Sequence, residues 1–191
     1  MTPVNGCDGR LADDAAERGA LMAWLSTKTY ASERGLSCAM RQWAADSHCA
    51  VLHGYALGFK FVFAAEQLDA RGWVVDFGRA GFGQIRAWLH ETFDHSLLVA
   101  QDDPFRADLV RLGELGLANV RLVPGTSCER LAQFVFEATQ PMIAAATKER
   151  CWIAEVECSE HGANSGVFRN PDAVLREISA DALARLAAAL T

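Results

Sequence analysis

The strongest constraint on the fold is a strict alternation of apolar residues between Tyr55 and Phe63. Leu57, Phe59 and Phe61 recur at every second position up to Phe63. Successive side chains of a β-strand point to opposite faces of a sheet, so this period predicts a half-buried strand. The phenylalanine face of such a strand needs a second layer of structure to cover it.

Three further segments are expected to complete the sheet. Asp69–Gly72 has the composition of a turn and leads into Trp73–Phe77, which predicts a hairpin. A third strand is expected at Val120–Leu122, before the Pro124–Gly125 turn. A fourth strand is expected over Trp152–Glu160, where apolar residues alternate with polar ones.

Two helices are expected between these strands. Apolar residues three and four positions apart predict a helix from Phe82 to Phe93 that ends near Asp94, and a loop is expected to follow it. Thr126 to Glu129 has the form of a capping box and predicts the start of a second helix. Pro141 is expected to end or kink that helix, because proline cannot donate its backbone hydrogen bond.

The sequence therefore predicts a single domain of the α+β class, with an antiparallel four-stranded sheet and two helices packed on one face. Extra helices are expected at both termini. The expected core spans residues 26–168. Residues 1–25 form an N-terminal extension with an amphipathic helix at Leu11–Leu25, and residues 169–191 form a helical C-terminal extension that starts at Asn170-Pro171.

Composition excludes several classes of function. The net charge of -6 argues against a nucleic-acid partner, because affinity for phosphates comes from an excess of Lys and Arg. No run approaches the roughly 18 to 20 apolar residues that span a bilayer, so we expect no membrane partner and a cytoplasmic location. The six cysteines lack the spacing of a disulfide framework and are expected to be reduced thiols.

The densest group of chemically capable residues lies between Ser47 and Tyr55. It contains His48, Cys49 and His53, whose imidazoles and thiolate suit Zn²⁺ or general-base chemistry. From spacing alone a structural role is favoured, because buried cysteine commonly acts as a small hydrophobe and two histidines are too few for a catalytic zinc site.

Four other residues are candidates with local alternatives. Asp94 and His95 could orient and hold a proton, but His95 could equally compensate the dipole at a helix end. Glu160 ends a predicted strand, and its carboxylate could accept the parallel N–H donors of a 2-amino-4-oxo-pyrimidine edge or simply be solvated. Glu129 is explained locally by the capping box.

Taken together, these pieces occur in an order that resembles the 6-pyruvoyl- and 6-carboxy-tetrahydropterin synthases, small lyases of the tunnelling fold. The matching segments are Cys49–Gly54, Gly72–Phe77, Asp94-His95, Thr126–Ala132 and Glu160–Phe168. The resemblance implies a lyase that acts on dihydroneopterin triphosphate or a related pterin, in queuosine or pterin-cofactor biosynthesis. It also implies a homo-oligomer, a dimer of trimers, with sites between subunits.

The resemblance implies a role for each candidate residue. Cys49 would be the general base, Asp94 and His95 its proton relay, and Glu160 the pterin anchor. Glu129 would also lie at the substrate. In this family three histidines hold a Zn²⁺ ion that grips the side-chain hydroxyls of the substrate.

The zinc site is where the sequence departs from the family pattern. Tyr55 stands where the second histidine of a His-Gly-His motif belongs, and either Ser32 or His48 stands at the upstream position. The metal candidates are therefore His48 and His53. Phe168 replaces a tyrosine. The alternatives are a catalytically lapsed, metal-poor pterin- or purine-binding oligomeric protein, and a pterin aldolase or epimerase that uses no metal.

Overall fold

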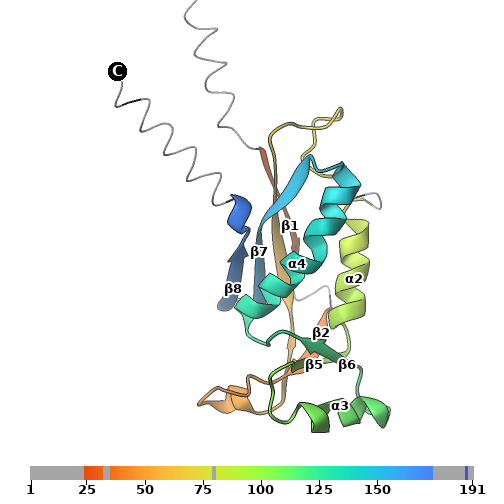
Figure 1. Cartoon of the computed structure of the whole chain (residues 1–191), viewed down its shortest axis with the longest axis vertical. Coiled ribbons are helices and arrows are strands. Elements are labelled where there is room, and N and C mark those ends of the chain that lie inside the picture. Colours follow the sequence, from red (N-terminus) through yellow and green to blue (C-terminus); the bar gives the residue numbers. More distant parts are fainter. Residues whose placement is uncertain (1–23, 32–34, 79–80, 174–187, 189–191) are drawn as a thin grey trace, which may run out of the picture.

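The computed structural model describes residues 24–31, 35–78, 81–173 and 188 (Figure 1). The elements are β1 (Trp24–Tyr30), β2 (Ser37–Met40), a 3₁₀ turn (His48–Ala50), β3 (His53–Ala56), β4 (Gly58–Ala65), α2 (Gly83–Phe93), β5 (Ser96–Ala100), α3 (Arg106–Glu114), β6 (Val120–Val123), α4 (Cys128–Thr147), β7 (Cys151–His161) and β8 (Asn164–Arg169). No helix among these residues is long and apolar enough to cross a membrane.

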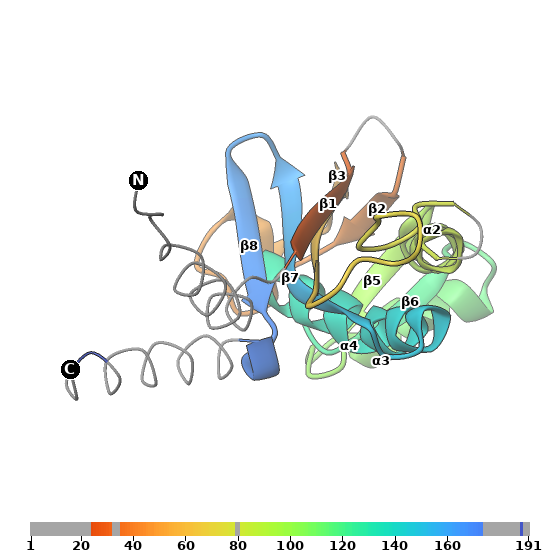
Figure 2. The ribbon, with the colours of Figure 1, turned by 90° about the horizontal axis from the view of Figure 1, so that it is seen from above.

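The larger sheet has the strand order β1-β4-β7-β8, and every pair in it is antiparallel. Figure 2 shows α2 and α4 on the same face of this sheet. Phe59, Phe61 and Phe63 of β4 are fully buried, and Phe59 packs on Phe93 of α2 with ring centroids 4.8 Å apart. The antiparallel four-stranded sheet with two helices on one face is confirmed.

The predicted strand Tyr55–Phe63 divides into two strands. Leu57 separates β3 from β4, and its backbone N–H donates to the carbonyl of Leu36 at 3.2 Å. β3 belongs to a second, smaller sheet with the order β3-β2-β5-β6. The chain therefore crosses between the two sheets at Leu57.

The smaller sheet corrects the expectation of a single sheet. Its β2–β5 and β5–β6 pairs are parallel, and α3 packs against β5 and β6. The segment after α2 was expected to be a loop, but it forms β5, in which all five residues are buried. A strand covered on both faces shows no alternation, so the periodicity gave no sign of it.

The predicted strand Trp73–Phe77 is wrong. Both edges of β4 are occupied by β1 and β7, so this segment finds no edge of that strand to join. The turn before it does form, because Gly72 donates to the Asp69 carbonyl at 2.9 Å. The guanidinium of Arg150 holds the segment by donating to the carbonyls of Gln67 and Val74, at 2.7 and 2.8 Å.

The helix boundaries differ from expectation at α4. Ser127 rather than Thr126 is the N-cap, and its hydroxyl accepts from the Arg130 N–H at 3.3 Å. The Thr126 hydroxyl donates instead to the Arg41 carbonyl at 2.7 Å. Pro141 lies inside the helix and does not end it.

The terminal predictions are tested only in part. Trp24 and Leu25 were assigned to an N-terminal helix but belong to β1, and the remainder of Leu11–Leu25 lies outside the described residues. The Asn170 side chain accepts from the Asp172 N–H at 3.0 Å, and helix begins at Pro171 as predicted. Beyond residue 173 the structure describes only Ala188.

Candidate functional site

The short β2–β3 pair places four side chains on one face. Met40 is opposite His53 and Cys38 is opposite Tyr55 in the antiparallel register. Directly paired residues, and residues two apart on a strand, point to the same side of a sheet. Met40 and Cys38 are buried there, and His53 and Tyr55 are partly buried.

His53 has one ring nitrogen satisfied and one open. Its Nδ1 lies 2.7 Å from the carbonyl oxygen of Val51, which can only accept, so Nδ1 is the protonated nitrogen of the neutral ring. Its Nε2 is buried and has no hydrogen-bond partner in the part of the chain that the structure describes. The ring contacts Tyr55 edge to face with centroids 5.1 Å apart. His53 therefore presents a bare acceptor inside the site.

Tyr55 lies among acidic groups from three other segments. Its pKa is raised, first by desolvation of the phenol. The negative charges of three neighbours raise the pKa further: Glu160, Cys49 and Cys128. Tyr55 therefore keeps its proton, and the end of β7 approaches it, with the His161 ring centroid 6.1 Å from that of Tyr55.

Glu160 lies at the end of β7 and is connected to the Cys49 turn through Gln42. The Gln42 side-chain amide donates to a Glu160 carboxylate oxygen at 3.4 Å. The backbone N–H of Gln42 donates to the Cys49 carbonyl at 2.8 Å. Gln42, which follows β2, is thus hydrogen-bonded both to the predicted anchor Glu160 and to the backbone of the predicted base Cys49.

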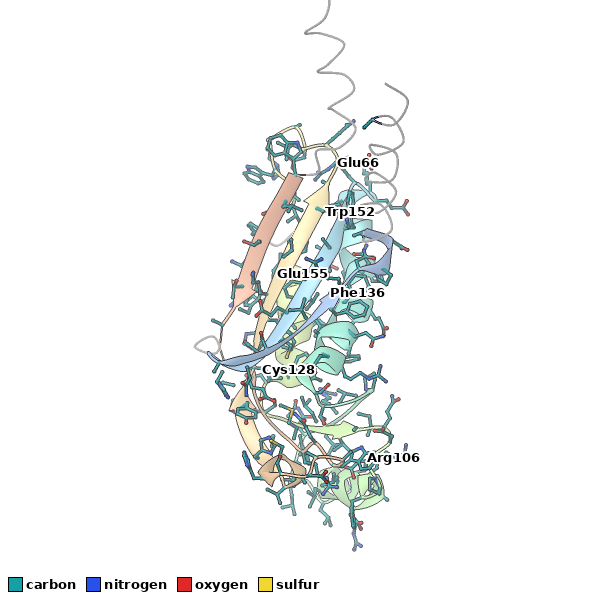
Figure 3. The ribbon with its side chains drawn as sticks, turned by 90° about the vertical axis from the view of Figure 1, so that its left-hand side faces the viewer. Glu66, Arg106, Cys128, Phe136, Trp152 and Glu155 are labelled. Carbon is teal, nitrogen blue, oxygen red and sulfur yellow. The ribbon has the colours of Figure 1, made fainter. Side chains whose placement is uncertain are left out.

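Cys128 is a site residue that the sequence analysis missed. It is the first residue of α4 and lies at the end of the larger sheet nearest the smaller one (Figure 3). Its pKa is lowered, chiefly by a hydrogen bond from the Cys158 thiol, although desolvation and the charges of Glu160 and Glu129 oppose this. A cysteine directly after a Ser N-cap is the signal that could have identified it, because helix N-termini favour the thiolate.

Glu129 is exposed in the first turn of α4. Because Ser127 caps this helix, the capping-box role predicted for Glu129 is wrong. A carboxylate in the first turn favours the helix dipole without a specific partner. Glu129 adjoins Cys128, so it lies at the edge of the site.

Asp94 and His95 touch each other but lie at the other end of β2. Asp94 accepts from the Ser37 N–H at 3.3 Å and is 3.1 Å from His95 Nδ1. Desolvation alone would raise the pKa of Asp94, but the charge and hydrogen bond of His95, with smaller contributions from Ser37 and His90, lower it. Three residue steps along β2, about 10 Å, separate this pair from Met40 and the Cys49 turn beyond it.

The residues present do not fit a three-histidine zinc site. β2 ends at Met40, so the position opposite His53 carries a thioether rather than the His48 considered from the sequence, and Ser32 lies outside the described residues. His48 is exposed on the 3₁₀ turn. Among the described residues no three His, Cys, Asp or Glu side chains are grouped to hold a metal. Thioether and phenol are poor zinc ligands beside the usual imidazole and thiolate.

Two solved structures share this fold. An uncharacterized protein of Wolinella succinogenes aligns with a TM-score of 0.65 and 17% identity, over 78% of this chain and 99% of that chain. The 6-pyruvoyl tetrahydropterin synthase of Plasmodium vivax aligns with a TM-score of 0.55 and 14% identity, over 77% and 98%. The predicted α+β tunnelling fold is thereby confirmed.

Sequence similarity to curated proteins is local. A segment of 55 residues is 40% identical to the 6-carboxy-5,6,7,8-tetrahydropterin synthase of Rickettsia felis, and it covers 29% of this chain and 39% of that protein. The corresponding match in Rickettsia typhi is 36% identical over 55 residues. Residues 29–171 match the family described as 6-pyruvoyl tetrahydropterin synthase. The chain therefore belongs to the 6-pyruvoyl tetrahydropterin synthase family.

Proposed function

We propose that this protein is a lyase of the tetrahydropterin synthase type that acts on dihydroneopterin triphosphate or a related pterin, in queuosine or pterin-cofactor biosynthesis. The observation that carries this proposal is the pair of Gln42 hydrogen bonds that connects the Cys49 turn to Glu160. A thiol that can take a proton and a carboxylate that can clamp a donor edge thus lie in one site.

Glu160 is proposed as the pterin anchor. The 2-amino and ring N–H groups of a pterin are parallel donors, and a carboxylate can accept both. Gln42 donates to one oxygen of this carboxylate and so restrains its rotation. The bound pterin would then extend from Glu160 toward Tyr55 and His53.

Cys49 is proposed as the general base, with Asp94 and His95 as its relay. Within one chain this pair lies about 10 Å from the Cys49 turn, too far for direct proton transfer. We therefore propose a homo-oligomer in which the pair of one copy serves the Cys49 of another. His95 is suited to such a contact because its side chain is 87% exposed.

Turnover of dihydroneopterin triphosphate, followed by chromatography of the products, tests this function. Cys49→Ala is expected to abolish turnover and to leave pterin binding within about twofold, because the thiol moves protons and does not anchor the ring. Cys151→Ala is the matched control, since Cys151 is buried at the opposite end of β7. Equal activity of wild type and Cys49→Ala would refute the proposed base.

The second candidate is a metal-poor pterin-binding oligomer without turnover. Tyr55 favours it, because it stands where the family pattern has a zinc-binding imidazole, and Met40 places only a thioether opposite His53. The same assay separates the two candidates: pterin binding without product in the wild type supports the second one.

A further inference from the structure

The buried Nε2 of His53 requires a partner that the described residues do not supply. Buried polar atoms in folded proteins are nearly always hydrogen-bonded, so an unpartnered one in a candidate site points to a ligand. The Val51 carbonyl holds the proton on Nδ1, which leaves a lone pair on Nε2. The missing partner must therefore be a donor or a metal ion.

The neighbours of His53 favour a hydrogen-bond donor over a metal ion. Met40, directly opposite on β2, has only a thioether, which is a weak acceptor and donates nothing. Tyr55 carries a phenol, whose hydroxyl can donate a hydrogen bond and is a poor zinc ligand beside imidazole or thiolate. Within the described part of the chain, His53 belongs to no group of three His, Cys, Asp or Glu side chains that could hold a metal ion.

His53 and Tyr55 together match a hydroxyl group. The two rings contact edge to face, with centroids 5.1 Å apart. The acceptor nitrogen of His53 and the donor phenol of Tyr55 are thus neighbours on one face of β3. A hydroxyl donates one hydrogen bond and accepts another. The ring centroid of Tyr55 is also 6.1 Å from that of His161, the residue after Glu160. A ligand bound to Glu160 would therefore extend toward Tyr55 and His53.

We infer that His53 Nε2 accepts a hydrogen bond directly from a side-chain hydroxyl of the bound pterin, with the Tyr55 phenol donating beside it, so that this pair recognises the substrate side chain without a metal. This inference rests on the proposed function and deepens it. It makes His53 a specificity residue for hydroxylated pterins.

Binding measured in the presence of a chelator tests the inference. The probes are 7,8-dihydroneopterin, whose side chain carries hydroxyls, and 6-methyl-7,8-dihydropterin, which has none. The wild type is expected to prefer dihydroneopterin by about tenfold, the value of one hydrogen bond to a buried acceptor. His53→Leu is expected to lose this preference and to retain its affinity for the methyl compound.

His161→Leu is the matched control, because that exposed histidine lies beside Glu160 and is expected to keep the preference. A preference that survives in His53→Leu overturns the inference, as does a preference in the wild type that requires added Zn²⁺. Failure of both probes to bind the wild type overturns the inference together with the proposed function. Binding of both with equal affinity overturns the inference alone.

A spectrum of the wild type gives a readout that does not depend on the folding of a variant. In a ¹⁵N-resolved histidine spectrum, the Nε2 of His53 is expected to give the signal of an unprotonated ring nitrogen. That signal is expected to shift on addition of dihydroneopterin and to stay in place with the methyl compound. An unchanged signal with dihydroneopterin bound would contradict the hydrogen bond.

Discussion

Glu160 is the residue on which the proposed recognition of a pterin depends most directly. Glu160→Gln keeps the size of the side chain but replaces one acceptor oxygen with a donor. We expect the affinity for dihydroneopterin to fall about 10- to 100-fold, because hydrogen bonds to a charged group are the strong ones. Fluorescence titration of the pterin measures this change.

Glu157→Gln is the control for this substitution. Glu157 lies on the same strand and is 3.7 Å from the Lys60 ammonium, so it contributes charge without belonging to the site. Its substitution is expected to leave affinity unchanged. An equal loss of affinity in both variants would mean that Glu160 acts only through long-range charge.

Cys38 makes the stability of the protein sensitive to alkaline pH. Burial raises the pKa of its thiol from 9.0 to about 12, so between these values the unfolded chain loses a proton that the folded chain keeps. The folded state then binds more protons, and stability falls as pH rises. Between about pH 8 and pH 10.5 this thiol alone removes about 2 kcal/mol of unfolding free energy.

Urea unfolding of Cys38→Ala at the two pH values checks this expectation. The variant is expected to lose about 2 kcal/mol less than the wild type over the same interval, whatever its stability at pH 8. An identical pH dependence in both proteins would mean that the Cys38 thiol is not held protonated by burial.

At the residue scale the sequence indicated where the candidate site lies, but it did not identify all the residues of that site. The His53 ring contacts Tyr55, and Gln42 connects the Cys49 turn to Glu160, but the roles of these residues stay predictions. Met40 could not be recognised, because the end of β2 is defined only by its pairing with β3. The distance between Asp94 and Cys49 could not be predicted either, because the order of residues in the sequence does not show that β2 lies between them.

At the scale of elements, α4 closes the site by lying on β8. A Cβ placed on Gly166 would lie 2.5 Å from the Glu129 nitrogen and 2.9 Å from the Cys128 Cβ. Gly166→Ala must therefore displace the first turn of α4, and we expect a loss of about 1 to 3 kcal/mol in unfolding free energy. Pterin affinity is expected to fall as well, because Cys128 and Glu129 move.

Gly162→Ala in the β7–β8 hairpin is the matched control, because a Cβ there meets nothing within 4 Å. It is expected to change stability by less than about 0.5 kcal/mol. Denaturant unfolding and pterin titration of both variants give the comparison. Equal stability of the two variants would mean that α4 yields to the added methyl group without cost.

The elements that the sequence predicted well are those with one exposed face. α2 and β7 show periodic burial, because each covers the core on one side only. β5 was not predicted, because it is covered on both faces and its residues do not alternate between apolar and polar. The segment Trp73–Phe77 has the composition of a strand, but its place beside β4 is taken, and no local pattern carries that information.

At the scale of the whole molecule, the proposed site would be divided between copies of the chain. The Cys49 turn lies beyond the Met40 end of β2, and the Asp94–His95 pair contacts its Ser37 end. A site assembled from two copies needs an intact Cys49 in one and an intact His95 in its neighbour. Variants that lack one of these residues can therefore complement each other.

We expect Cys49→Ala and His95→Ala to be inactive alone and to recover activity when they are dissociated, mixed in equal amounts and reassembled. Random assembly gives about a quarter of the sites both intact residues, so recovery is expected to approach that fraction of wild-type turnover. Cys49→Ala mixed with Glu160→Gln is the control. Both of those residues belong to the same part of the site, so no reassembled site regains both, and no activity beyond that of Glu160→Gln alone is expected. Recovery in both mixtures would place Glu160 and Cys49 in different copies at one site, and recovery in neither would place the whole relay within a single chain.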